Sequence, residues 1–331
     1  MRLTRRKIIR AASAALAIPL GSFVKAQSAK AAATYPDRPI HLIVPFAPGG
    51  ITDISARLLG TKLGERFGQA VIVENRAGGN QIIGTEYVAN SAPDGYTLIM
   101  GTMGSHAVNA SLRKDLKIDI KNGFAPISLV TVQPLVLLLN PKIKATSVDQ
   151  LLQLCKTNPS KYTYGSAGVG TTAHMAAELF QIKTGVKLTH VPYKGSSPML
   201  IDLIGGVIDL AFDYAPTAIP QMNSGRLRAL AVTSAEKTEF APDLPPMNKY
   251  VPGFQVTAWQ GLFAPARTSA DVLNLLSREV QQIMKLPDII PKLREIGAEG
   301  VGNKPDEFAS FVQDEIELWA NVIRTNNIQP E

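Results

Sequence analysis

Cysteine is almost absent from this sequence of 331 residues, and Cys155 is the only one. An intramolecular disulfide is therefore excluded. Because Cys155 falls in the amphipathic pattern 148–155, we expect a buried structural thiol rather than a reactive one. A long apolar run is also missing, and a mean hydropathy of +0.06 excludes a protein with many membrane spans.

Acidic residues are missing from residues 1–33, where a basic head over 4–10 precedes an apolar run over 11–20 and a small-residue stretch over 26–33. That order predicts an export signal peptide over residues 1–33. The arginine pair at 5–6, followed by two isoleucines, favours the twin-arginine route; an ordinary Sec signal is the alternative. The absence of cysteine from this region predicts no lipid anchor, so we expect a soluble protein in the periplasm.

The basic charge of the chain comes from that first segment. The whole sequence has 34 basic and 27 acidic residues, and residues 1–33 hold seven basic ones, so residues 34–331 carry 27 of each. A net charge of zero gives no support to nucleic-acid binding.

The remaining sequence alternates strand and helix patterns, which predicts an α/β fold with a mostly parallel sheet covered on both faces. Residues 124–139 are β-rich but contain Pro126 and Pro134, which favours a crossover between domains over one central strand. Residues 228–232 are expected to form the return crossover. The predicted domains are residues 34–130 with 231–331 (domain 1) and 131–230 (domain 2).

Each half contains a strand that runs into a glycine turn opening a helix, at 46–53 and at 165–172. Glycine lets the backbone approach a ligand closely, and the following helix directs unpaired N–H groups and a partial positive charge at the turn. Such a site binds anions without a cationic side chain. Since neither turn contains lysine or arginine, neutral donors are expected to hold a carboxylate at modest affinity between the turns.

Other chemistries have less support. Residues 168–173 approximate a dinucleotide fingerprint, but the acidic residue expected about twenty positions on is missing. The four histidines lack metal spacing, and no G-x-S-x-G elbow supports a hydrolase built from Ser166 and His174. We therefore expect no catalytic residue, no metal and no cofactor. His174 is expected to cap or pack its helix, while Asp213 either binds a ligand amine or hydroxyl or caps a helix near Thr217.

Eight motifs in order resemble the Bug-type receptors of tripartite tricarboxylate transporters. The resemblance covers nearly all of residues 35–325, with motifs at 35–40, 44–53, 73–78, 92–98, 164–171, 191–195, 225–232 and 259–266. The resemblance implies a type II-like periplasmic binding protein with two α/β domains and a ligand cleft between them. It also implies a non-enzymatic receptor for a di- or tricarboxylate, an acidic amino acid or an aromatic acid, and a membrane permease partner. A sensor kinase is the alternative partner, and a monomer is expected.

The resemblance also assigns the site. One ligand carboxylate is expected beside the first turn and the other end of the ligand beside the second. The candidate ligand-binding residues are Phe46, Ala47, Gly49, Gly50, Asp53, Ser105, Ser166, Ala167, Gly168, Thr171, Asp213 and Tyr214. The chain departs from the family pattern at Ala47, Ile51 and Tyr214, so citrate-like specificity does not follow, and Tyr214 favours a larger or flatter acid.

Overall fold

The computed structural model describes residues 35–330, so the predicted signal peptide lies outside the described residues. Residues 38–331 form one compact unit. Within 35–330, no helix is both long and apolar enough to cross a bilayer.

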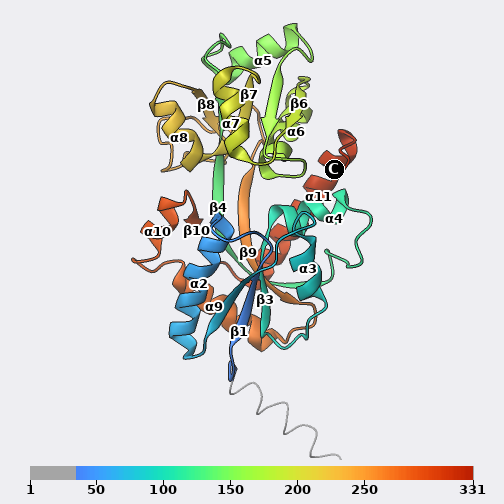
Figure 1. The fold of residues 1–331 in the computed structure, drawn as a ribbon, viewed down its shortest axis with the longest axis vertical. Helices are drawn as coiled ribbons and strands as arrows, with labels where there is room; N and C mark the ends of the chain where they lie inside the picture. The colour runs from blue at the N-terminus through green and yellow to red at the C-terminus, as the bar shows by residue number, and fades with distance from the viewer. Residues whose placement is uncertain (1–34, 331) are drawn as a thin grey trace, which may run out of the picture. The chain divides into compact units, whose positions relative to one another are not determined.

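Ten strands among the described residues make one continuous sheet (Figure 1). They are β1 (Ile40–Val44), β2 (Val71–Asn75), β3 (Thr97–Thr102), β4 (Phe124–Leu139), β5 (Thr163–Ser166), β6 (Thr189–Pro192), β7 (Leu210–Tyr214), β8 (Arg228–Val232), β9 (Thr257–Pro265) and β10 (Glu299–Gly300).

The helices lie between these strands in sequence. They are α2 (Ile51–Phe67), α3 (Ile82–Ala89), the π-helix η1 (Gly104–Val108), α4 (Asn109–Leu112), α5 (Val148–Thr157), α6 (Thr172–Thr184), α7 (Ser196–Gly205), α8 (Ala215–Asn223), the 3₁₀ turn η2 (Met247–Lys249), α9 (Ala270–Ile283), α10 (Ile290–Glu295) and α11 (Pro305–Thr325).

The sheet order is β2-β1-β3-β9-β4-β7-β5-β6, with β8 and β10 also paired to β4. The outer pairs at both ends are parallel, as the strand–helix alternation predicts. Every pair that involves β9 or β4 is antiparallel. The α/β fold class is confirmed, but the prediction of a mostly parallel sheet is wrong for its centre, because β9 runs against β3 and β4 runs against both β9 and β7.

Strand β4 is both crossover and central strand, which corrects the expectation that its prolines interrupt it. It pairs with β9 up to Pro134 and with β7 from Leu135 onward. Pro126 lies at a register shift, and Pro134 lies where one partner replaces the other. Proline has no N–H to donate, so a strand accepts it where the ladder is already irregular.

Buried aromatic and aliphatic side chains fill the space between the sheet and its helices. Trp259 and Phe263 of β9 pack against Phe308 of α11, with ring centroids 6.0 and 4.9 Å away. Cys155 is a buried free thiol, as its pattern predicts. Burial raises the pKa of this thiol to about 11, which keeps it protonated and unreactive.

Candidate functional site

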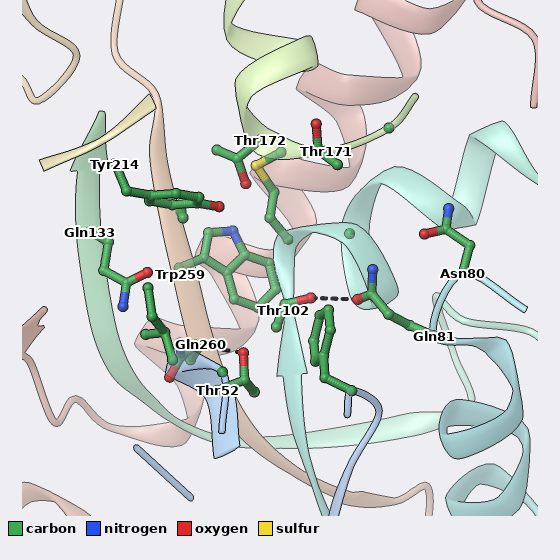
Figure 2. Close-up of a pocket in the computed structure, with 17 residues that line it drawn as sticks. Thr52, Asn80, Gln81, Thr102, Gln133, Thr171, Thr172, Tyr214, Trp259 and Gln260 are labelled. Carbon is green, nitrogen blue, oxygen red and sulfur yellow. Dashed lines mark hydrogen bonds between the residues drawn. The ribbon is translucent and has the colours of Figure 1, made fainter. Parts of the chain in front are cut away.

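A cavity of about 240 Å³ lies where the helix starts of both halves face the two long strands (Figure 2). It is lined by Phe46, Gly50, Ile51, Thr52, Asn80, Gln81, Thr102, Met103, Gly104, Gln133, Gly170, Thr171, Thr172, Tyr214, Ala258, Trp259 and Gln260. These residues come from the segment after β1, the starts of α2 and η1, the segment before α3, the ends of β3 and β7, the turn before α6 and its first residue, the middle of β4 and the first half of β9.

The first glycine turn presents an uncapped helix to this cavity. Helix α2 begins at Ile51, within the predicted turn 46–53, and Gly50 caps it in an extended conformation with no side-chain hydrogen bond. The first helical hydrogen bond runs from Ile54 N–H to the Gly50 carbonyl, at 3.0 Å. An α-helix leaves its earliest N–H groups without intrahelical partners, so this end carries donors and partial positive charge.

Asp53 fixes the conformation of the first turn through hydrogen bonds outside the cavity. Its carboxylate accepts hydrogen bonds from Gly49 N–H at 2.9 Å, Arg57 Nε at 3.0 Å and Asn75 Nδ2 at 2.9 Å. Burial by itself would raise the pKa of Asp53, but these donors together with the Arg57 charge bring it below its ordinary value. The carboxylate is therefore ionised and engaged, and it is absent from the cavity lining.

The second glycine turn uses its donors internally. Gly170 N–H donates to His174 Nδ1 at 3.2 Å, and Thr171 N–H donates to the Gly168 carbonyl at 3.3 Å. The Thr171 side chain accepts from His174 N–H and caps α6. The two turns thus have the same outline but different chemistry, because only the first leaves its helix without a side-chain cap.

Aromatic rings form one wall of the cavity. Figure 2 shows Tyr214 beside Trp259, with Gln133 next to them and Gln81 and Asn80 on the other side. The Trp259 indole N–H donates to Glu315 at 2.7 Å, so it is already paired and the ring serves as an apolar surface. Burial raises the pKa of Tyr214, which keeps its hydroxyl protonated.

Neutral polar side chains supply the rest of the lining. Thr102 Oγ1 donates to Gln81 Oε1 at 2.7 Å, and Gln260 Nε2 lies 3.5 Å from Thr52 Oγ1. The lining contains no lysine, arginine, histidine, aspartate or glutamate. Among residues 35–330 no cluster of acidic, histidine or cysteine side chains could hold a metal ion. Any anion in the cavity therefore meets helix N–H groups and neutral side chains.

Four of the predicted ligand-binding residues line this cavity: Phe46, Gly50, Thr171 and Tyr214. Ala167 and Gly168 line, together with Thr171, a second cavity of about 390 Å³ on the other side of the second turn. Ala47, Gly49, Asp53, Ser105, Ser166 and Asp213 are absent from both linings. Their ligand contacts stay predictions.

Asp213 lies fully buried at the end of β7. Ser196 Oγ donates to one of its oxygens at 2.8 Å and Thr217 Oγ1 to the other at 2.7 Å. Burial raises the pKa of Asp213, and these two hydrogen bonds oppose that rise. The carboxylate thus links the starts of α7 and α8 through two side-chain hydroxyls, and neither helix has a side-chain cap hydrogen bond. Whether Asp213 also binds a ligand stays a prediction.

The serine and histidine considered for a hydrolase are not paired with each other. Ser166 Oγ lies 2.7 Å from His190 Nε2, whereas His174 accepts from Gly170. Ser166 is fully buried, and the His190 ring packs against the rings of Tyr164 and His174. A nucleophile needs a path to its substrate and a base oriented by a third group. Among the described residues, no hydrogen bond brings an acid to His190.

Residues missed by sequence reasoning make up most of the lining, including Gln81, Gln133 and Gln260. The sequence offers one local signal near Gln81, the pair Gly78-Gly79. In the structure this pair opens a run of four residues with positive φ that ends at Gln81, whose φ is 75°. Such backbone in non-glycine residues is uncommon and concentrates at functional sites. Gln133 and Gln260 carry no local signal, because strand pairing alone brings them to the cavity.

Comparison with known proteins places this site in a family. The profile described as "Tripartite tricarboxylate transporter family receptor" matches residues 55–328. The chain belongs to this receptor family. Its relatives include protein BugT of Bordetella pertussis, which is 39% identical over 293 residues, or 88% of this chain and 90% of BugT. The prediction of a Bug-type receptor rather than an enzyme is thereby confirmed.

Solved structures of this receptor family share the fold. Rpa4515 of R. palustris, solved with adipate, is 36% identical, with a TM-score of 0.76 over 90% of this chain and 100% of its own. MatC of Rhodopseudomonas palustris, solved with bound malate, is 30% identical, with a TM-score of 0.72 over 87% of this chain and 100% of its own. Both relatives therefore hold small carboxylates on the same framework.

Proposed function

We propose that the chain is a periplasmic receptor that captures a small organic carboxylate in the cavity at the start of α2. The uncapped helix start, facing a cavity without charged side chains, carries this proposal. Neutral N–H donors at a helix start match one carboxylate group, and the two solved relatives with adipate and malate support the ligand class.

The proposed receptor delivers its ligand to the permease of a tripartite transporter and reaches the periplasm through the twin-arginine route. It works as a monomer whose two lobes, residues 34–130 with 231–331 and residues 131–230, close on the ligand. The exchange of β4 partners at Pro134 supports this division, because each part of β4 belongs to a different set of strands. Delivery to a sensor kinase would use the same closed form. Uptake of labelled ligand by cells with and without the permease separates the two roles, because only transport requires the permease.

Thermal unfolding with a panel of carboxylates tests ligand capture. A ligand at a hundredfold excess over its Kd should stabilise the protein by about 2.7 kcal/mol, visible as a rise in Tm. The panel includes mono-, di- and tricarboxylates, with sugars and amines for comparison. A rise with sugars or amines and none with any acid would overturn the ligand class.

Replacing Gly50 with valine tests the first turn. The backbone at Gly50 has φ −81° and ψ 169°, which valine adopts, and an added Cβ meets nothing within 4 Å. The fold should survive, while the side chain enters the space at the helix start and weakens carboxylate binding about tenfold or more. Gly205→Val is the control, because Gly205 lies outside the cavity and an added Cβ there has one ordinary contact, with Val207 at 4.0 Å. Equal ligand affinity in both variants would remove the first turn from the site.

A further inference from the structure

Gln133 has a buried amide that nothing in the protein satisfies. Its side chain lines the cavity and is only 4% exposed, yet Nε2 has no hydrogen-bond partner. The other two glutamines of the lining are engaged, Gln81 by Thr102 and Gln260 by Thr131 at 3.1 Å. An unpaired buried amide is costly, so a site where it persists calls for a partner from outside the chain.

Strand register explains why Gln133 is unpaired. Thr131 and Gln133 lie on the same face of β4, since side chains two apart in a strand share a face. The residue opposite Thr131 on β9 is Gln260, and the two side chains hydrogen bond. The residue opposite Gln133 is Ala258, which has no polar group to offer. The amide is thus left free beside the aromatic wall, as Figure 2 shows.

The amide can serve a ligand in either sense. Rotation by 180° exchanges its NH₂ and carbonyl ends, so it donates to an acceptor or accepts from a hydroxyl. The ring faces of Tyr214 and Trp259 lie beside it, and flat groups stack well on such faces. A second ionised carboxylate would find no cation in this lining, and burying an unpaired charge is expensive.

We propose that Gln133 determines specificity, and that the ligand is a flat aromatic monocarboxylate carrying a neutral hydrogen-bonding group that pairs with the Gln133 amide. This rests on the proposed function, because the carboxylate of that ligand is the group held at the start of α2. Gln133 selects the opposite end of the ligand, and the rings of Tyr214 and Trp259 select its flat body.

Matched probe acids test the proposal. Calorimetry or thermal shift compares benzoate with 3- and 4-hydroxybenzoate, and with adipate as the dicarboxylate. In the wild-type protein one of the hydroxybenzoates should bind about tenfold tighter than benzoate, the effect of one well-made buried hydrogen bond. Benzoate and the preferred hydroxybenzoate should each bind more tightly than adipate.

A variant at position 133 tests whether the Gln133 amide causes the tighter binding of the hydroxybenzoate. Gln133→Met keeps the length of the side chain and removes its polar end, so the preference for the hydroxybenzoate should vanish. Gln221→Met is the matched control, since Gln221 also has a buried unpaired amide oxygen but lies outside the cavity lining. Melting temperatures confirm that each variant is folded at the binding temperature.

The outcomes separate this inference from the proposed function. Adipate binding more tightly than the aromatic acids, or an unchanged hydroxybenzoate preference in Gln133→Met, overturns the inference and leaves carboxylate capture standing. Failure of every acid in the wild-type protein overturns both. Loss of the hydroxybenzoate preference in Gln133→Met, with the preference unchanged in Gln221→Met, establishes that Gln133 selects the hydrogen-bonding group of the ligand.

Discussion

Acidification from pH 7 to pH 5 should destabilise the receptor by several kcal/mol, because three buried histidines stay uncharged in the folded protein. Burial lowers the pKa of His106 and of His174 to about 3, and that of His190 to about 4. The neighbouring His190 contributes further to the shift of His174. In the unfolded chain each histidine titrates near its ordinary pKa of about 6.5.

The direction follows from proton binding. Below pH 6.5 these histidines bind protons in the unfolded state but stay neutral in the folded state. The free energy of unfolding therefore falls as the pH falls. Each histidine contributes up to about 1.4 kcal/mol per pH unit between pH 6.5 and its folded pKa. Three such groups would remove much of the stability typical of a domain by about pH 5. Denaturant unfolding at half-unit pH steps measures the slope.

Removing one of these histidines should reduce that slope by the equivalent of about one proton. His106 suits the test, because its ring stacks on Phe263 at 4.1 Å and lies outside the cavity lining. His106→Leu removes the titrating group, and Phe124→Leu, in the ring 4.5 Å away, disturbs the same packing without removing one. Equal slopes in the wild-type protein and His106→Leu would contradict the assignment.

Local sequence patterns predict the positions of the two glycine turns well, because glycine and capping residues act within a few positions of themselves. Helix α6 begins at Thr172, at the end of the predicted turn 165–172, with Thr171 as its cap and Gly185 after it. The equivalence of the two turns could not be judged this way. Whether their N–H groups are free depends on His174 folding back onto Gly170, a side-chain contact that no local pattern reveals.

The role of β4 and most of the cavity lining depend on pairing between distant segments. A proline is unfavourable within a continuous ladder but acceptable where partners change, so Pro134 indicates a crossover until the two partners are known. The same register places Gln133 opposite Ala258 and leaves its amide unpaired. Long-range register therefore decides which polar groups a ligand meets.

Placing a single methyl group on Gly261 should destabilise the protein by about 1–3 kcal/mol or more and weaken ligand binding. A Cβ at this position would come within 2.0 Å of Phe308 Cζ. Phe308 cannot retreat easily, because it is fully buried and packs against the rings of Trp259, Phe263 and Phe311. Strand β9 is itself fixed between β3 and β4.

The strain from Gly261→Ala should reach the cavity because Trp259, two residues along the same strand, forms its aromatic wall. Denaturant unfolding and ligand titration of one preparation measure both effects. Gly205→Ala is the control, since its added methyl group has free space. Combining Gly261→Ala with Phe308→Leu should cost less than the sum of the two single changes, because the smaller side chain relieves the overlap. Strict additivity would mean that the clash is relieved elsewhere and that Phe308 does not transmit it to Trp259.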